Sequence, residues 1–412
     1  MSSATVPNVT CLGCGCACDD LVIGVTAGRI TSVEPPCPRA QAWFGAGQVP
    51  DRVVADGRPA TAEAAIAAAA ELLAAQAGRA LVYLGPDLTS RAQRAAVALA
   101  DLLRATVDGA TSAEAAAGLL AAQRRGRAAA TLGEIRNRAD LVLCWAVDPP
   151  ARYPRYFERY APAGNGRALV SVSIGADRGP EHAELTIPLA PHQEVAALSV
   201  LRATVQGNPL GMLGEPFQAV AALGERLLRS RYVAIVHDAE PGRERGRDHH
   251  RAEGLIALAQ ALNGPTRAAL SSLRAGGSRS GIESVLTWQT GYPMGVEFSG
   301  GVPRYAPGHR GLDRAGGGGF GAALVAGSAA ELGGTDALAR IPTVVIGPRA
   351  SEAKFGPRIA IDTGVAGIHE PGTGYRMDEV PLPLTPPLPG ARGAGETLEA
   401  LLAAVRRLGG RA

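Results

Sequence analysis

Two hydrophobic patterns alternate along most of this chain. Alanine-rich stretches with helical spacing, such as residues 61–77, are followed by short, mostly apolar runs, such as residues 79–85. Continuous apolar runs bounded by turn residues are typical of parallel strands that are buried on both faces. By the same patterns we expect helices at 90–104, 112–124, 194–206 and 252–263, and strands at 140–145, 168–173, 232–237, 343–346 and 358–362. The alternation predicts an α/β fold with layered parallel sheets.

The first fifty residues depart from this alternation. Residues 21–33 predict two short strands around an Ala27-Gly28 turn, which would form a small β cap that carries a cysteine-rich loop. Residues 276–321 are rich in glycine and have too little periodicity for a core element, so we expect a loop with a functional or interfacial role there. The predicted division of the chain is a cap at 1–50, a Rossmann-like α/β domain at 51–190, a second α/β domain at 191–390 and a C-terminal helix at 391–412.

Composition excludes several classes of protein. The 412 residues are 46% hydrophobic, which is enough for two or three packed α/β units. A net charge of +3 gives no field that would attract nucleic acid. No stretch approaches eighteen uninterrupted apolar residues, and the first residues lack the pattern of a secretory signal, so we expect no membrane segment and a cytoplasmic location.

The strongest chemical signal is a run of cysteines near the start of the chain. Cys11, Cys14 and Cys18 follow a C-x2-C-x3-C spacing, and Cys37 is a distant fourth thiol. This spacing is typical of a loop that wraps a [4Fe-4S] cluster, and these four residues are the predicted ligands of a cluster or of its vestige. A structural zinc site remains an alternative, although it commonly has two C-x2-C pairs and only one is present. Two disulfides are disfavoured because the chain shows no sign of entering an oxidising compartment.

Other residues of chemical interest give weaker signals. Cys16 is interpreted as an additional thiol, and Cys144, inside an apolar run, as a small buried hydrophobic residue. Trp145 and Trp288 are predicted to be packing residues. We assign no ligand to the four glycines at 316–319, because the Lys and Ser or Thr of a phosphate-binding loop are missing.

Several histidine and aspartate positions are weaker candidates for a site. Asp248, His249 and His250 lie in a stretch dense in charge, which predicts a solvated loop better than a metal site. His192 and His309 follow turn residues and are candidates to line a cleft, but a lone histidine is more often a satisfied polar group.

Several motifs together resemble the B subunit of formylmethanofuran dehydrogenase. They are the cysteine run with Asp19-Asp20 and the segments 133–140, 145–149, 154–155, 286–293, 303–308 and 372–378, which span nearly the whole chain. The resemblance implies a molybdopterin-oxidoreductase-like fold, similar to formate dehydrogenase. In that family one [4Fe-4S] cluster lies beside a tungsten or molybdenum bis-pterin, and carbon dioxide is reduced to formate.

Two departures from the family pattern bear on function. In an ungapped alignment from Val107 to Asp140, the family's metal-ligating Cys-His pair falls on Glu114 and Ala115. Neither a carboxylate nor a methyl group replaces a soft thiolate ligand to tungsten or molybdenum. The sequence at 299–301 is Ser-Gly-Gly where the family has Ser-Arg-Gly, so a cation that would lie by the metal is missing. We therefore do not expect a tungsten or molybdenum bis-pterin in this chain.

A retained scaffold without metal ligands resembles the B subunit of the bacterial formyltransferase/hydrolase complex of methylotrophs. The resemblance implies a non-redox scaffold that is bound to homologues of the A, C and D subunits of the dehydrogenase, with its own active site lost. Such a complex transfers formyl from formyl-tetrahydromethanopterin to a methanofuran-type carrier and releases formate at a zinc-type site in its A subunit. The carrier is held by the complex and not necessarily by this chain.

Two alternatives remain open. The chain is the redox-active B subunit of a tungsten or molybdenum formylmethanofuran dehydrogenase if another group binds the metal. It is a single-cluster electron-transfer subunit if the cysteines hold iron and no formyl chemistry accompanies the complex.

Overall fold

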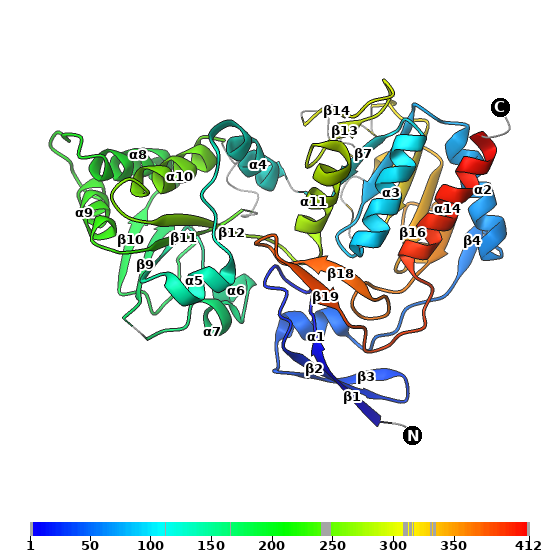
Figure 1. Ribbon diagram of the computed structural model, residues 1–412, viewed down its shortest axis with the longest axis horizontal. Coiled ribbons are helices and arrows are strands. Elements are labelled where there is room, and N and C mark those ends of the chain that lie inside the picture. The colour runs from blue at the N-terminus through cyan, green and yellow to red at the C-terminus, as the bar shows by residue number, and fades with distance from the viewer. Residues whose placement is uncertain are drawn as a thin grey trace. The chain divides into compact units, whose positions relative to one another are not determined.

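The protein is divided into two compact units, shown in the computed structural model of Figure 1. The structure describes residues 3–111, 113–164, 166–239, 249–307, 312, 315, 317–329, 332 and 335–409, with backbone only at 113, 114 and 335. Unit 1 consists of residues 1–111 and 276–412, and unit 2 of residues 112–275. Unit 2 is thus inserted between two halves of unit 1. The ranges 51–190 and 191–390, which the sequence suggested as domains, each contain strands of both units.

Unit 1 is built on a nine-stranded sheet with the order β14-β13-β7-β6-β15-β16-β17-β4-β5. The five central strands are parallel and the two strands at each edge are antiparallel. The strands are β4 (Val53–Ala55), β5 (Arg58–Pro59), β6 (Ala80–Leu84), β7 (Thr106–Gly109), β13 (Val296–Glu297), β14 (Arg304–Tyr305), β15 (Ala322–Ala326), β16 (Thr343–Gly347) and β17 (Ile359–Asp362).

Helices cover one face of this sheet (Figure 1). They are α2 (Ala62–Ala74), α3 (Ser90–Leu102), α11 (Arg279–Thr290) and α14 (Ala394–Gly409), and short elements α13 (Thr335–Leu338) and η2 (Ala350–Glu352) also belong to unit 1. The hydroxyls of Thr61 and Thr89 accept hydrogen bonds from the first turns of α2 and α3 and so fix where these helices begin. The predicted helices at 61–77, 90–104 and 391–412 are confirmed in type and place.

One expectation about the glycine-rich stretch is wrong. Residues 276–321 contain α11, whose Ile282, Val285 and Leu286 are fully buried in the core of unit 1. The three apolar residues follow helical spacing, i, i+3 and i+4, but serine and glycine surround them and mask the period. This stretch therefore contributes to the core.

The small N-terminal cap is confirmed and has one strand more than expected. β1 (Ser3–Val9), β2 (Leu21–Thr26) and β3 (Arg29–Glu34) form an antiparallel sheet in the order β1-β2-β3. The cysteine-rich loop connects β1 to β2, and α1 (Pro38–Phe44) follows β3. A two-stranded antiparallel sheet of β18 (Gly372–Tyr375) and β19 (Pro381–Leu384) completes unit 1.

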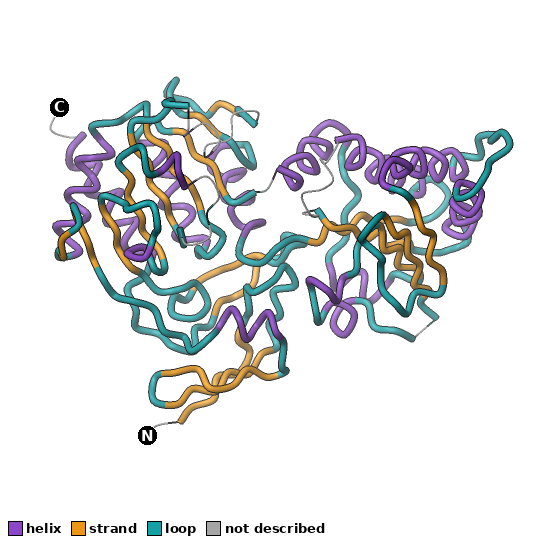
Figure 2. The backbone as a smooth tube through the Cα atoms, turned by 180° about the vertical axis from the view of Figure 1, so that it is seen from behind, coloured by secondary structure: helices purple, strands orange, loops and turns teal. Residues whose placement is uncertain are grey.

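Unit 2 has a five-stranded, wholly parallel sheet with the order β10-β9-β8-β11-β12. Its strands are β8 (Leu141–Trp145), β9 (Ala168–Ile174), β10 (Leu185–Leu189), β11 (Val233–Asp238) and β12 (Ala268–Leu273). Its helices are α4 (Ala113–Arg125), α5 (Leu132–Arg138), α6 (Pro149–Arg152), α7 (Tyr156–Tyr160), η1 (Pro191–Gln193), α8 (Glu194–Val205), α9 (Phe217–Leu228) and α10 (His249–Leu262). Figure 2 shows the strands of this sheet side by side.

The predicted α/β class with parallel sheets is therefore confirmed. Among the parallel strands of each sheet, the strand that comes first in sequence has later strands on both sides. This strand is β6 in unit 1 and β8 in unit 2. Strand order reverses at β6–β15 and at β8–β11, and such switch points are where open α/β sheets bind ligands. No helix among the described residues combines the length and the apolar character needed to cross a bilayer.

Candidate functional site

The β1–β2 loop brings the predicted cysteine ligands together. The backbone N–H of Cys11 donates to the carbonyl of Cys18 at 2.8 Å, which closes the loop, and Ala17 takes a positive φ of 39° inside it. Cys37 immediately precedes α1. Cys11, Cys18 and Cys37 are buried, whereas Cys14 is partly exposed. The structure therefore places all four predicted ligands in one region of unit 1.

Electrostatic effects confirm that these thiols are neighbours. Burial is the main factor that raises the pKa of the Cys11 thiol, and the negative charges of Cys14, Cys18 and Cys37 raise it further. The pKa of Cys14 is lowered to about 7, chiefly by a hydrogen bond from the Cys16 side chain. If all four groups were ionised, their negative charges would repel one another, and a bound metal centre would offset that repulsion. Cys16 thus acts as a hydrogen-bond donor to Cys14.

The predicted donor set consists of four thiols, a set that iron–sulfur clusters and structural zinc both accept. Among the described residues, no three His, Cys, Asp or Glu side chains converge as ligands of a single ion. A tetrahedral zinc site needs four sulfurs within one coordination shell, whereas a cube of four irons keeps its thiolates further apart. The N–H of Gly13 also donates to the Cys11 sulfur at 3.2 Å, and such bonds tune cluster thiolates. If a cluster is bound, Cys11, Cys14, Cys18 and Cys37 would hold it. All six cysteines lie in the described residues, and none of them is in a disulfide.

Neighbouring segments of unit 1 hold the cysteine loop in place. The N–H of Gly277 donates to Leu12 O at 2.7 Å, and the N–H of Met377 donates to Gly15 O at 3.0 Å. A Cβ on Gly276 would lie 2.7 Å from Leu12 O, so only glycine permits this approach. Two of the glycines from the supposed loop region therefore position the candidate centre.

The turns at the switch point of unit 1 are in direct contact. The N–H of Gly85, after β6, donates to Ala326 O at 2.6 Å. The carboxylate of Asp87 accepts the N–H of Ser328, after β15, at 3.0 and 3.1 Å. Gly327 has a φ of 105°, and a Cβ there would lie 2.7 Å from Asp87 Oδ1. The chain's own groups thus bridge the place where such sheets commonly bind a ligand.

A buried ion-pair network occupies the switch point of unit 2. Arg251 Nε donates to Glu194 Oε1 at 2.6 Å, and the indole N–H of Trp145, at the end of β8, donates to the same oxygen at 3.0 Å. At the end of β11, Asp238 forms an ion pair with Arg152, and its carbonyl accepts from Arg251 Nη1 at 3.4 Å. Sequence patterns do not indicate this network, because its members are far apart along the chain.

Residues 114 and 115, onto which the resemblance places the family's metal ligands, lie at the start of α4 in unit 2. Ala115 is buried and offers only a methyl group. The side chain of Glu114 lies outside the described residues. At Ala115, therefore, the chain has no donor atom for a metal.

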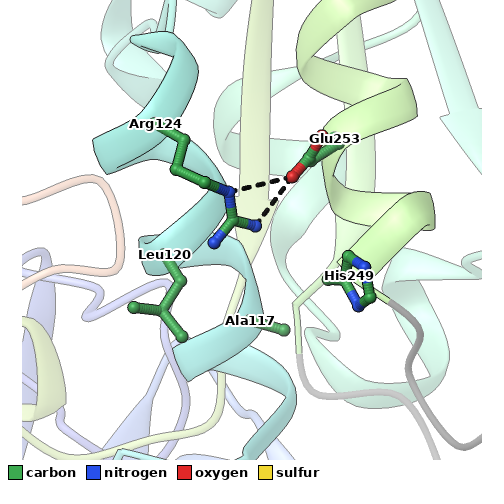
Figure 3. A pocket seen from close by; sticks show the side chains of 5 residues that line it. All are labelled: Ala117, Leu120, Arg124, His249 and Glu253. Carbon is green, nitrogen blue, oxygen red and sulfur yellow. Dashed lines mark hydrogen bonds and ion pairs between the residues drawn. The ribbon is translucent and has the colours of Figure 1, made fainter.

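His249 and His250 begin α10, so the expectation of a loop at these two residues is wrong. The alanine-rich sequence after them extends the helix back to the histidines. His249 lines a shallow surface depression of about 460 Å³ with Ala117, Leu120, Arg124 and Glu253 (Figure 3). Glu253 accepts hydrogen bonds from Arg124 at 2.7 Å and from Arg125 at 2.9 Å. The charged side chains of Arg124, Arg125 and Glu253 at this depression are therefore paired with one another.

The remaining predicted positions have mixed outcomes. Cys144 and Trp145 are fully buried, as expected, and burial raises the pKa of the Cys144 thiol. The interpretation of Trp288 as a packing residue is wrong. Its side chain is 60% exposed, because it lies on the outer side of α11. His192 is exposed in η1, while Asp248, His309 and Gly316 lie outside the described residues.

Comparison with known proteins gives relatives over most of the chain. The chain is 29% identical to the B subunit of the tungsten-containing formylmethanofuran dehydrogenase 2 of Methanocaldococcus jannaschii, with 92% of this chain and 93% of that protein covered. It is 28% identical to the protein of the same name from Methanococcus maripaludis, with 92% of each covered. It is 31% identical to the B subunit of the formyltransferase/hydrolase complex Fhc of Methylorubrum extorquens, with 61% of this chain and 67% of that protein covered. No protein-family model matches the chain.

A solved structure agrees with these relatives. A chain in the crystal structure of the formyltransferase/hydrolase complex FhcABCD from Methylorubrum extorquens, in complex with methylofuran, superposes with a TM-score of 0.73 and 25% identity. The match covers 87% of this chain and 99% of that one. The fold is thus that of an α/β component of a multi-subunit complex. The chain belongs to the family of the formylmethanofuran dehydrogenase B subunit, which includes the B subunit of Fhc.

Proposed function

We propose that this chain is the non-redox scaffold subunit of a formyltransferase/hydrolase complex. The complex transfers formyl from formyl-tetrahydromethanopterin to a methanofuran-type carrier and releases formate, and this chain binds homologues of the A, C and D subunits in the cytoplasm. The observation that carries the proposal is Ala115, a buried methyl group at a family metal-ligand position.

The two switch points support a scaffold role. A redox subunit of this family would hold a bis-pterin on a molybdopterin-oxidoreductase-like arrangement of layers, which we propose as the ancestry of the fold. In unit 1 the carboxylate of Asp87 bridges the turns, and in unit 2 Arg251 pairs with Glu194, which also accepts from Trp145 at the end of β8. A bound pterin cofactor could use these side chains only if their ion pairs and hydrogen bonds within the chain were broken first. Breaking a buried ion pair is costly.

The cysteine site has a separate role in this proposal. Cys11, Cys14 and Cys18 keep a spacing typical of a [4Fe-4S] loop, and the charges of Cys14, Cys18 and Cys37 affect the pKa of Cys11. In a subunit without a redox partner, a bound cluster stabilises the fold of the cap, since binding free energy adds to folding free energy.

A redox-active dehydrogenase subunit is the second candidate. The observation in its favour is that the tungsten-containing relatives match over 92% of this chain, against 61% for the B subunit of Fhc. For this candidate, a residue at a position other than 115 must bind the metal.

Two activities separate the candidates in the complex purified with its partner subunits. The scaffold proposal predicts transfer of formyl to the carrier and formate release without any added electron acceptor. It also predicts that no artificial electron acceptor is reduced when formylated carrier is supplied. Reduction of the acceptor at a rate comparable with formate release would overturn the proposal.

A further inference from the structure

Trp43 presents a buried hydrogen-bond donor beside the cysteine loop. It lies in α1, the helix that Cys37 precedes. Its Nε1 is buried, and no hydrogen-bond acceptor among the described residues reaches it. A buried N–H without a partner costs about 1–3 kcal/mol, so such a group needs an explanation.

The Trp43 side chain packs against two apolar groups that include residues of the cysteine loop. It contacts the apolar group of the cap that contains Cys11 and Cys37, and also the group that contains Leu12 and Ala17. Gly13 permits this approach, because a Cβ there would lie 3.0 Å from the Cβ of Trp43 and 2.5 Å from Arg39 O.

Two other donors at the loop have sulfur acceptors. The N–H of Gly13 donates to Cys11 Sγ, and Cys16 donates to Cys14. Each cysteine ligand contributes one sulfur, whereas a cluster also has inorganic sulfides, which accept hydrogen bonds from nearby donors. The indole N–H of Trp43 lacks an acceptor, and an inorganic sulfide of a cluster bound nearby would supply one.

We propose that the indole N–H of Trp43 donates a hydrogen bond to a sulfur of the iron–sulfur group held by Cys11, Cys14, Cys18 and Cys37. Trp43 is then a positioning residue that orients the cluster and stabilises its more negative, reduced form, because a donor interacts more strongly with greater negative charge. The inference rests on the proposal that these cysteines hold a cluster, and it is independent of whether the complex transfers formyl groups.

The test uses the full chain with its co-purified partners, isolated anaerobically and reconstituted with ferrous iron and sulfide. Trp43→Phe removes the donor and keeps an aromatic ring, and Trp288→Phe, at the 60% exposed tryptophan of α11, is the matched control. Iron and acid-labile sulfide are counted, and the midpoint potential is measured by redox titration. We expect unchanged iron and sulfide in both variants and a lower midpoint potential in Trp43→Phe alone.

Two results would overturn the proposal. One is a midpoint potential in Trp43→Phe equal to that of the wild type, and the other is a wild-type chain that takes up no iron and sulfide. Formyl transfer is assayed on the same samples, so loss of the cluster and loss of the proposed function are distinguished. If Trp43→Phe does not fold, pulsed EPR of the reduced wild-type chain with ¹⁵N-indole label replaces it. Coupling to one indole nitrogen supports the proposal, and its absence refutes it.

Discussion

Glu194 and Arg251 form a buried ion pair at the switch point of unit 2, with Oε1 and Nε 2.6 Å apart. The same oxygen accepts the indole N–H of Trp145 at 3.0 Å. The three side chains come from α8, α10 and the end of β8, and together they join both sides of the strand-order reversal between β8 and β11. Side chains of this chain thus bond to one another at this strand-order reversal.

Replacing Glu194 by Ala leaves the Arg251 guanidinium buried without its counter-ion. We expect the free energy of unfolding of unit 2 to fall by about 3–5 kcal/mol. The urea dependence of amide hydrogen exchange in β8 measures this change. The control is Glu352→Ala, which removes the half-exposed pair with Arg349 and should cost about 0–1 kcal/mol. Equal losses of unfolding free energy in the two variants would show that the buried pair contributes no more to stability than the half-exposed pair.

The core role of α11 is tested by Ile282→Ala. Ile282 is fully buried against the nine-stranded sheet, so we expect a loss of about 2–5 kcal/mol in the stability of unit 1. Trp288→Ala, on the exposed side of the same helix, should change stability by no more than about 0.5 kcal/mol. Denaturant unfolding of both variants gives the comparison, and a larger loss in Trp288→Ala would contradict the assignment of faces.

Glu370 predicts a pH dependence of stability. Its carboxylate accepts the N–H groups of Ala394 and Gly395 at the start of α14, at 2.9 and 3.1 Å, yet burial raises its pKa above the usual value of 4.5. A raised pKa means that the folded state binds a proton more tightly than the unfolded state. The folded state therefore loses stability as the pH rises from about 4.5 through the folded-state pKa.

Glu370→Gln removes this titration, so the wild type should lose stability relative to the variant between pH 4.5 and neutral pH. Thermal unfolding at several pH values measures the difference. Glu399 is the control, because its hydrogen bond with Arg91 lowers its pKa. Relative to Glu399→Gln the wild type should gain stability as the pH rises toward 4.5. If the wild type changed stability in the same direction relative to both variants, the raised pKa of Glu370 would be refuted.

The cysteine ligands make a prediction about iron. Cys14→Ser should lose most of the bound iron and acid-labile sulfide, since the thiolate is the preferred ligand of the cluster. Cys144→Ser is the control, because Cys144 is buried in β8 of the other unit. Both are measured after anaerobic reconstitution. Iron in Cys14→Ser equal to that of the control would remove Cys14 from the ligand set.

Much of the fold was predictable because its signals are local. The helix at 61–77 and the strand at 79–85 were predictable because N-capping, helical spacing and continuous apolar runs act within a few residues. The strand β15 was missed, since three of its five residues are alanine, which favours helix. The insertion of unit 2 was also missed, because β15 pairs with β6, a partner more than two hundred residues earlier, and such pairing leaves no local pattern.

The candidate site divides in the same way. The cysteine loop was predictable because a C-x2-C-x3-C spacing is itself a geometric constraint. The Glu194–Arg251 pair was not, because its members are 57 residues apart and each looks like an ordinary surface charge in sequence. The exposure of Trp288 was likewise invisible, since it depends on which side of α11 faces the sheet.

Counting tungsten, molybdenum, iron and zinc per copy of this chain in the anaerobically purified complex tests the scaffold function most directly. We predict neither tungsten nor molybdenum, because Ala115 offers no donor and the switch points are occupied by internal contacts. We also predict zinc in one of the partner subunits. Tungsten or molybdenum near one atom per chain would contradict the scaffold function and show that the chain is a redox-active dehydrogenase subunit.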